Sequence, residues 1–276
     1  MIFYFLNFFK KNSRILDCTF NIKEGLKKRL DDLRSEAEIS VREGGKHLIL
    51  SDKEINEKKS AIPMALAIGA INSRLVDMGL RGFASINVQT SEVLDTHSFA
   101  VLLGVGASTI NPYIAFDSIY QRYEKKLFGK LSFKECVERY VKSVDNGLLK
   151  IMSKMGISVL SAYRGGCNFE AVGLSRSVVA EYFPGMISRI SGIGISGIEK
   201  KIKKLHEKAF EKNISILPIG GIYKYRKNGE THQYQGNLIH TLQSAVSSNS
   251  YKTYKKYAEG IYNLPIINLR DLLEFK

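Results

Sequence analysis

The feature that most restricts the fold is an alternation of short apolar runs with segments of helical spacing over the first 211 residues. The apolar runs start near residues 47, 83, 108, 157 and 187. Such alternation predicts parallel strands joined by helices, in an α/β sheet or in part of a βα-barrel. In these folds functional residues lie where strands end and loops begin. The residues at the expected strand ends are Asp52, Gln89, Asn111, Tyr113, Tyr163 and Arg164.

The segments between the apolar runs have the spacing of amphipathic helices. The first ends at Gly44 and carries five apolar residues on one face: Leu26, Leu30, Leu33, Ala37 and Val41. Similar spacing predicts helices over 63–79, 92–106, 132–154, 175–183 and 196–210. The apolar runs predict strands over 47–52, 83–90, 108–116, 157–163 and 187–193.

After residue 211 the alternation stops. Asn228 and Gly229 form a dipeptide that is typical of a β-hairpin turn. Tyr251, Tyr254 and Tyr257 then follow at helical spacing. We therefore expect three parts: a short appendage over 1–14, an α/β domain over 15–211 and a linker region over 212–276.

The charge of the chain raises the question of an anionic partner. The formal net charge is +14 and the isoelectric point about 9.5, values shared by proteins that bind nucleic acids or membrane surfaces. However, the lysines are spread along the chain, and Ile, Asn and Tyr are also abundant, as in proteins from AT-rich genomes. The apolar N-terminal run is much shorter than the ~20 residues of a membrane-spanning helix. We expect neither nucleic acid nor membrane as a partner.

The cysteines and histidines show no metal-binding spacing. Cys18, Cys136 and Cys167 lie far apart without a CxxC pair, and the five histidines form no HxxxH or HExxH motif. The sequence therefore predicts no metal site. Three scattered thiols suit a reducing compartment, so we expect a cytoplasmic protein.

Two short motifs contain groups that bind anions. YRGG, residues 163–166, places a guanidinium beside backbone N–H groups, which together grip carboxylates and phosphates. GIGISG, residues 192–197, has the form of a phosphate-binding glycine loop. A tight turn with a structural arginine explains the first motif more simply, and a strand-to-helix turn explains the second. Cys167 lacks a recognisable base, so we interpret it as a packed thiol.

A longer stretch resembles a known family. GLLKIMSKMGISVLSAYRGGCNFEAVGL, residues 147–174, is similar to the central region of the large subunit of glutamate synthase. The segments THSFAVLLGVGASTINPYIAF, GGIYKYRKNGETH and LRDLLEF resemble the same region in the same order. The similarity extends over about 15–276. One departure is Gly166-Cys167-Asn168, where the family usually has Ala-Gln-Ile.

The resemblance implies a central domain that joins two catalytic domains and helps to wall the path of ammonia. Its fold would be a partial or degenerate βα-barrel, like a flavin barrel without flavin. In the family a glutaminase domain precedes it and a barrel with FMN and an iron–sulfur cluster follows it. We therefore expect a detached central domain with no catalytic, cofactor-binding or metal-binding residues of its own.

The resemblance also implies partners. These would be separately encoded glutaminase and FMN-barrel parts of glutamate synthase, with the small subunit contacted indirectly. The candidate interdomain or ammonia-path contacts are Asn111, Pro112, Tyr113, Tyr163 and Arg164. Two alternatives remain open: a free-standing protein that binds flavin or another phosphate ligand, and a basic nucleic-acid-binding protein.

Overall fold

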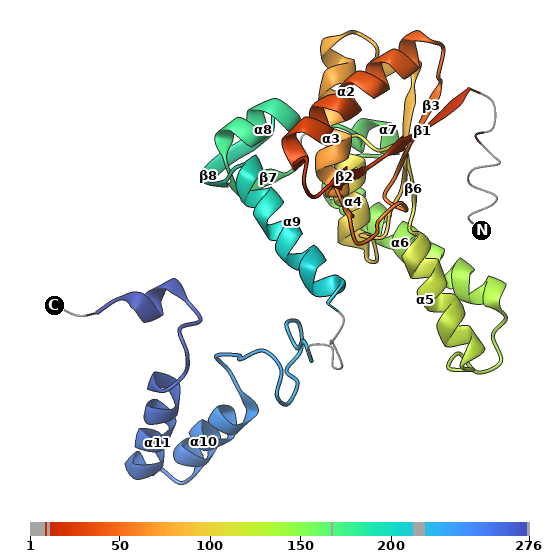
Figure 1. Cartoon of the computed structure of the whole chain (residues 1–276). Helices are drawn as coiled ribbons and strands as arrows, with labels where there is room; N and C mark the ends of the chain where they lie inside the picture. The colour runs from red at the N-terminus through yellow and green to blue at the C-terminus, as the bar shows by residue number, and fades with distance from the viewer. Residues whose placement is uncertain (1–8, 10–11, 167, 212–218, 275–276) are drawn as a thin grey trace. The chain divides into compact units, whose positions relative to one another are not determined.

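The computed structural model describes residues 9, 12–166, 168–211 and 219–274 of the 276-residue chain (Figure 1). The chain divides into two compact units, Met1–Phe210 and Glu211–Lys276. Cys167 lies outside the described residues. No helix of the described part is long and apolar enough to cross a bilayer. The functional division into appendage, central domain and linker stays a prediction.

The first unit is built on a four-stranded, fully parallel sheet. Its strands are β1 (Ser13–Asp17), β3 (His47–Ser51), β5 (Ser85–Gln89) and β6 (Thr109–Asn111), paired in that order. The connecting helices are α2 (Leu26–Arg42), α3 (Met64–Asp77) and α4 (Thr96–Gly104). The α/β fold class predicted from the alternation is confirmed.

The three connecting helices cover one face of this sheet. Leu48 and Leu50 of β3 and Ile86 and Val88 of β5 belong to one buried cluster with apolar residues of α2, α3 and α4. Figure 1 shows these helices on the same side of the strands. This arrangement follows from the strand order, because right-handed crossovers that always advance in one direction place their helices on one face. The sheet therefore has no reversal point of the kind found in dinucleotide-binding folds.

The opposite face carries a row of residues in register. Ile15, Ile49, Asn87 and Thr109 are partners across the four strands. Ile49 and Asn87 are buried, whereas Ile15 on the edge strand is 62% exposed. The four-stranded sheet ends at β1 and β6, and the other described strands pair elsewhere. The predicted partial barrel is thus not confirmed.

Two small sheets complete the first unit. Strands β2 (Thr19–Asn21) and β4 (Lys59–Ala61) pair antiparallel. Strands β7 (Glu170–Leu174) and β8 (Ile187–Ile193) pair parallel and are joined by α8 (Arg176–Tyr182). The remaining elements are α5 (Tyr113–Glu124), α6 (Phe133–Lys154), α7 (Leu160–Tyr163), α9 (Ile195–Ala209) and the 3-10 turn η1 (Arg81–Phe83).

Two predicted strands of the first unit need correction. The strand over 157–163 is wrong, because the chain forms helix α7 there. Of that run only Tyr163 is buried, while Val159 and Leu160 are exposed, so it lacks the two-sided burial of a parallel strand. The strand predicted over 108–116 ends at Asn111, because helix α5 begins at Tyr113 with Pro112 as its N-cap.

The second unit is helical. It contains α10 (Gly236–Ser247), α11 (Tyr251–Tyr262) and the 3-10 turn η2 (Leu269–Leu272). Asn228 adopts a left-handed conformation with φ of 63°, as its place in a turn requires. The predicted hairpin is nevertheless wrong, since residues 219–274 contain no strand. A turn alone does not make a stable hairpin where the flanking apolar residues, such as Ile222 and Tyr223, stay exposed.

Candidate functional site

A cluster of buried and half-buried polar side chains lies at the carboxyl edge of the four-stranded sheet. It comprises residues at or just beyond the ends of β3, β5 and β6: Asp52, Gln89, Thr90, Ser91, Asn111 and Tyr113. We call it the carboxyl-edge cluster. Four of these were predicted from strand ends, and the structure brings them together. Thr90 and Ser91 were missed, although their position directly after β5 could have identified them.

Asp52 is the centre of this cluster and is fully buried. Its Oδ2 accepts hydrogen bonds from the hydroxyl of Thr90 at 2.7 Å and from the backbone N–H of Ser91 at 2.8 Å. Its Oδ1 accepts from the hydroxyl of Tyr113 at 2.9 Å. A buried carboxylate needs such donors, because without them its desolvation would cost several kcal/mol.

Tyr113 closes the cluster from the start of helix α5. Burial, and then the negative charge of Asp52, raise the pKa of Tyr113 above its usual range. The phenol therefore stays protonated and can donate its hydrogen bond to Asp52. The ammonium of Lys53 lies 5.1 Å from the Tyr113 ring centroid. This cation–π contact places a positive charge beside the phenol ring.

Gln89 and Asn111 leave two polar atoms without a partner. They are register neighbours on β5 and β6 and are only 2% and 5% exposed. Gln89 Oε1 accepts from Ser51 at 3.0 Å, but Gln89 Nε2 and Asn111 Oδ1 make no hydrogen bond among the described residues. One is a donor and the other an acceptor. Together they suit a small polar molecule that both accepts and donates.

Glu92 lies next to this cluster. Its Oε2 accepts from the backbone N–H of Met64 at 2.9 Å, at the start of helix α3. Burial raises the pKa of Glu92 above its ordinary value, and the charge of Asp52 adds to that effect. The sequence analysis missed this carboxyl group. It follows β5 by three residues, within reach of the same edge.

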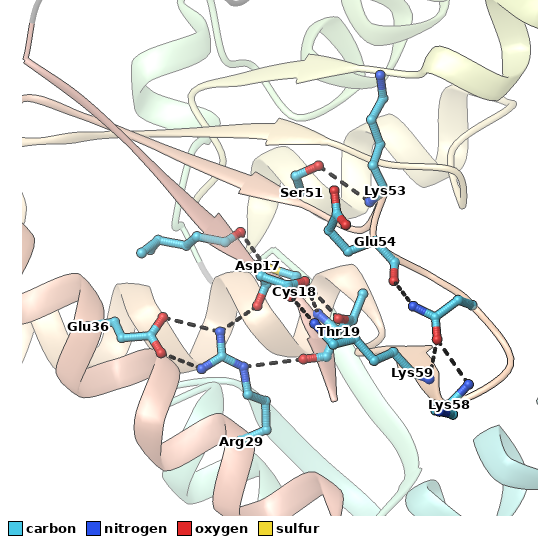
Figure 2. A network of polar contacts seen from close by, with 12 residues as sticks. Asp17, Cys18, Thr19, Arg29, Glu36, Ser51, Lys53, Glu54, Lys58 and Lys59 are labelled. Atoms are coloured by element: carbon cyan, nitrogen blue, oxygen red, sulfur yellow. Dashed lines mark hydrogen bonds and ion pairs between the residues drawn. The ribbon is translucent and has the colours of Figure 1, made fainter. Parts of the chain in front are cut away.

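A second polar network fixes the bend between β1 and β2, as Figure 2 shows. The guanidinium of Arg29 donates to the carbonyls of Asp17 and Thr19 at 2.6 and 3.2 Å, and to both carboxylate oxygens of Glu36. The Asp17 carboxylate accepts from the backbone and hydroxyl of Thr19. These contacts satisfy local backbone groups, so we assign this network a structural role.

The thiol of Cys18 sits inside that bend and is fully buried. Burial raises the pKa of Cys18 well above its usual range, with the positive charge of Arg29 offsetting only part of the effect. A thiol without thiolate character is a poor nucleophile and a poor metal ligand. Among the described residues no group of three His, Cys, Asp or Glu side chains could hold a metal ion.

The five predicted interdomain contacts do not form one exposed face. Asn111, Pro112 and Tyr113 lie at the carboxyl edge and are buried. Tyr163 is 1% exposed and packs in a separate apolar cluster with α4 and α6. Arg164 is exposed and donates to the hydroxyl of Ser108, just before β6, at 3.2 Å. The five residues thus lie at two separate places, because 157–163 is not a strand that ends beside the others. Their role as interdomain or ammonia-path contacts stays a prediction.

The glycine-rich turn at 192–197 joins β8 to α9, as a strand-to-helix turn. A Cβ on Gly192 would lie 2.1 Å from the carbonyl oxygen of Gly173 on β7, and one on Gly197 would lie 2.9 Å from Ile193. Close packing thus accounts for two of its glycines. A phosphate ligand is not needed to explain these two glycines.

Comparison with known proteins gives one consistent result. The family model of the glutamate synthase central domain matches residues 5–175. The NADPH-type glutamate synthase large chain of Azospirillum brasilense is 50% identical over 264 residues, and that of Bacillus subtilis (strain 168) is 39% identical over 266. Each match covers 95% of this chain.

A third relative carries a different name. The chloroplastic ferredoxin-dependent glutamate synthase of Spinacia oleracea is 37% identical over 280 residues, which is 96% of this chain. In all three relatives the match covers 17% of the relative's own length. The chain therefore spans about one sixth of the curated relatives that it matches.

Proposed function

Because the chain belongs to the glutamate synthase central domain family, we propose that it acts as the domain-linking part of a glutamate synthase. In this role it contributes to the formation of glutamate from glutamine and 2-oxoglutarate, and so to ammonia assimilation. The observation that supports the proposal is the extent of the match, which covers almost the whole chain in each of the three relatives named above.

The proposal assigns the chemistry to other parts of the enzyme. FMN and the iron–sulfur cluster are bound outside this chain, and the glutaminase nucleophile is also supplied elsewhere. Relatives named for NADPH and for ferredoxin match this segment over similar lengths. That similarity suits a segment that serves the same purpose whichever electron donor the enzyme uses.

The partners in this proposal are the glutaminase part and the FMN-barrel part of the large chain, with the small subunit contacted indirectly. Asn111, Pro112 and Tyr113 support the ammonia path from the carboxyl edge, and Tyr163 and Arg164 support a domain contact from a separate place. The free amide of Gln89 and the free carbonyl of Asn111 suit this role, because ammonia both donates and accepts hydrogen bonds.

The proposal is tested by complementation in trans. A relative's large chain is expressed with its matching segment deleted, its small subunit is added, and the present chain is supplied as a separate polypeptide. Glutamine-dependent glutamate formation should appear only when the present chain is added, and the chain alone should produce no glutamate. An unrelated basic α/β protein of similar size serves as the control.

Two results would contradict the proposal. One is catalysis by the pure, flavin-supplemented chain without any other part. The other is a failure to associate with the deleted large chain in gel filtration at micromolar concentration, with both proteins folded by circular dichroism. Association without activity would support the linking role. It would mean that the missing activity comes from the ammonia path and not from a failure of the parts to assemble.

A further inference from the structure

Two arginines converge on the turn at 106–108, between helix α4 and strand β6. Arg81, at the start of η1, donates to Asn72 Oδ1 at 2.7 Å, to the carbonyl of Ala84 at 2.7 Å and to the carbonyl of Gly106 at 2.9 Å. All three acceptors are neutral. They hold the guanidinium of Arg81 in one orientation but do not balance its charge.

Arg164 reaches the same turn from the end of helix α7. Its Nη1 donates to Ser108 Oγ at 3.2 Å, two residues beyond the carbonyl that Arg81 contacts. That hydroxyl also accepts from the backbone N–H of Ile86 on β5 at 3.3 Å. Ser108 therefore does not depend on Arg164 for a partner, and the contact does not explain a charged side chain at this position.

Neither arginine makes an ion pair with a carboxylate in the part of the chain that the structure describes. Arg29, Arg34 and Arg74, in contrast, each contact a glutamate. The pKa of Arg81 is lowered first by burial and then by the positive charge of Arg164, as expected for two like charges that approach the same turn. An anion between them would remove this repulsion.

We propose that Arg81 and Arg164 form a binding site for one small oxyanion at the turn 106–108. A guanidinium has five N–H donors, and the contacts described above use three on Arg81 and one on Arg164. The remaining donors of these two guanidinium groups match the oxygens of a carboxylate or a phosphate. The ligand is either the carboxylate of an acidic side chain from another polypeptide segment or a free phosphate ion.

The proposal does not depend on the assembly of glutamate synthase, because it concerns a site made entirely of this chain. It also gives Arg164 a role that the sequence motif left open. The tight turn after Tyr163 exists, with Gly165 at φ of 68°, and it directs the arginine toward Ser108. The turn is therefore structural, while the guanidinium that it presents is available to a ligand.

The site is tested with the full-length chain labelled with 15N. Inorganic phosphate and, separately, acetate are titrated at constant ionic strength, with chloride as the balancing anion. The side-chain Nε–H signals of Arg81 and Arg164 should shift together and saturate, with a dissociation constant on the order of millimolar. Arg164→Gln should weaken binding about tenfold or more, whereas Arg122→Gln, at an exposed arginine on α5, should leave it unchanged.

The relative affinities identify the source of the anion, and either outcome supports the site. Comparable affinity for acetate and phosphate points to a side-chain carboxylate, and a clear preference for phosphate points to the free ion. The proposal is overturned if no arginine signal saturates by 50 mM, a concentration about fiftyfold above a dissociation constant of about 1 mM. It is also overturned if Arg164→Gln binds phosphate as the unchanged chain does while its backbone spectrum shows a folded protein.

Discussion

The hydroxyl of Tyr113 donates to the carboxylate of Asp52 across 61 residues of sequence, at 2.9 Å. This bond ties the start of helix α5 to the end of strand β3. It spans the carboxyl edge of the sheet, with β5 between the two residues in the strand order. The bond therefore holds together the edge at which the polar cluster lies.

Tyr113→Phe should destabilise the chain by about 1.5–3 kcal/mol, because it removes a hydrogen bond to a buried carboxylate without opening a cavity. Urea unfolding followed by circular dichroism measures the change. Tyr120→Phe is the matched control, since Tyr120 is half exposed on the same helix and its ring contact with Phe133 survives the substitution. Equal midpoints for both variants would contradict a stabilising role for the Asp52 contact.

Glu92→Gln should change the pH dependence of stability. The folded-state pKa of Glu92 is raised, so its ionisation costs folding free energy as the pH rises above about 4.5 toward the folded value. Glutamine keeps an acceptor for Met64 but does not ionise. The variant should therefore gain stability relative to the unchanged chain between pH 4 and pH 7. A difference that is constant over this range would show that Glu92 is not the titrating group.

Gly192→Ala should destabilise the first unit by more than about 2 kcal/mol, because the new methyl group would overlap the carbonyl oxygen of Gly173. Gly82→Ala is the control, since nothing lies within 4 Å of a Cβ there and its φ is not in the left-handed region. Thermal unfolding of the two variants should separate clearly. Similar melting temperatures would mean that β7 and β8 do not approach as closely as described.

Cys18 should resist modification in the native chain. In a variant with Cys136→Ser and Cys167→Ser, a thiol reagent should label Cys18 at least about 100-fold more slowly than in denaturant, because the buried thiol is exposed only on unfolding. The reaction is followed by absorbance with and without 6 M guanidinium chloride. Rapid native labelling would place Cys18 at an accessible surface.

The sequence was sufficient for the fold class and for most helices. Residues on a buried face recur at regular spacing, so the sequence pattern predicts these elements. The alternation predicted strands β3, β5 and β8 and helices α2, α3, α4, α6, α8 and α9. Strands β1, β2, β4 and β7 were missed. Two of them have only three residues, too few to show a period.

The candidate site was predicted in part. The strand-end residues lie together as expected, since parallel strands end at one edge of the sheet: Asp52, Gln89, Asn111 and Tyr113. Arg164 did not join them, because an apolar run with strand-like composition formed a helix instead. The convergence of Arg81 with Arg164 could not be predicted, since η1 and α7 meet only through tertiary packing around the turn at 106–108.

The strand order β1-β3-β5-β6 also has a consequence for how the chain forms during synthesis. Each new strand pairs with the one that precedes it in the sheet, and partners such as His47 and Ser85 or Asn87 and Thr109 are only 38 and 22 residues apart. No strand has to wait for a distant one or insert between two that have already paired. The strands therefore leave the ribosome in the order in which they pair, and each new strand can add to the edge strand that is already in place.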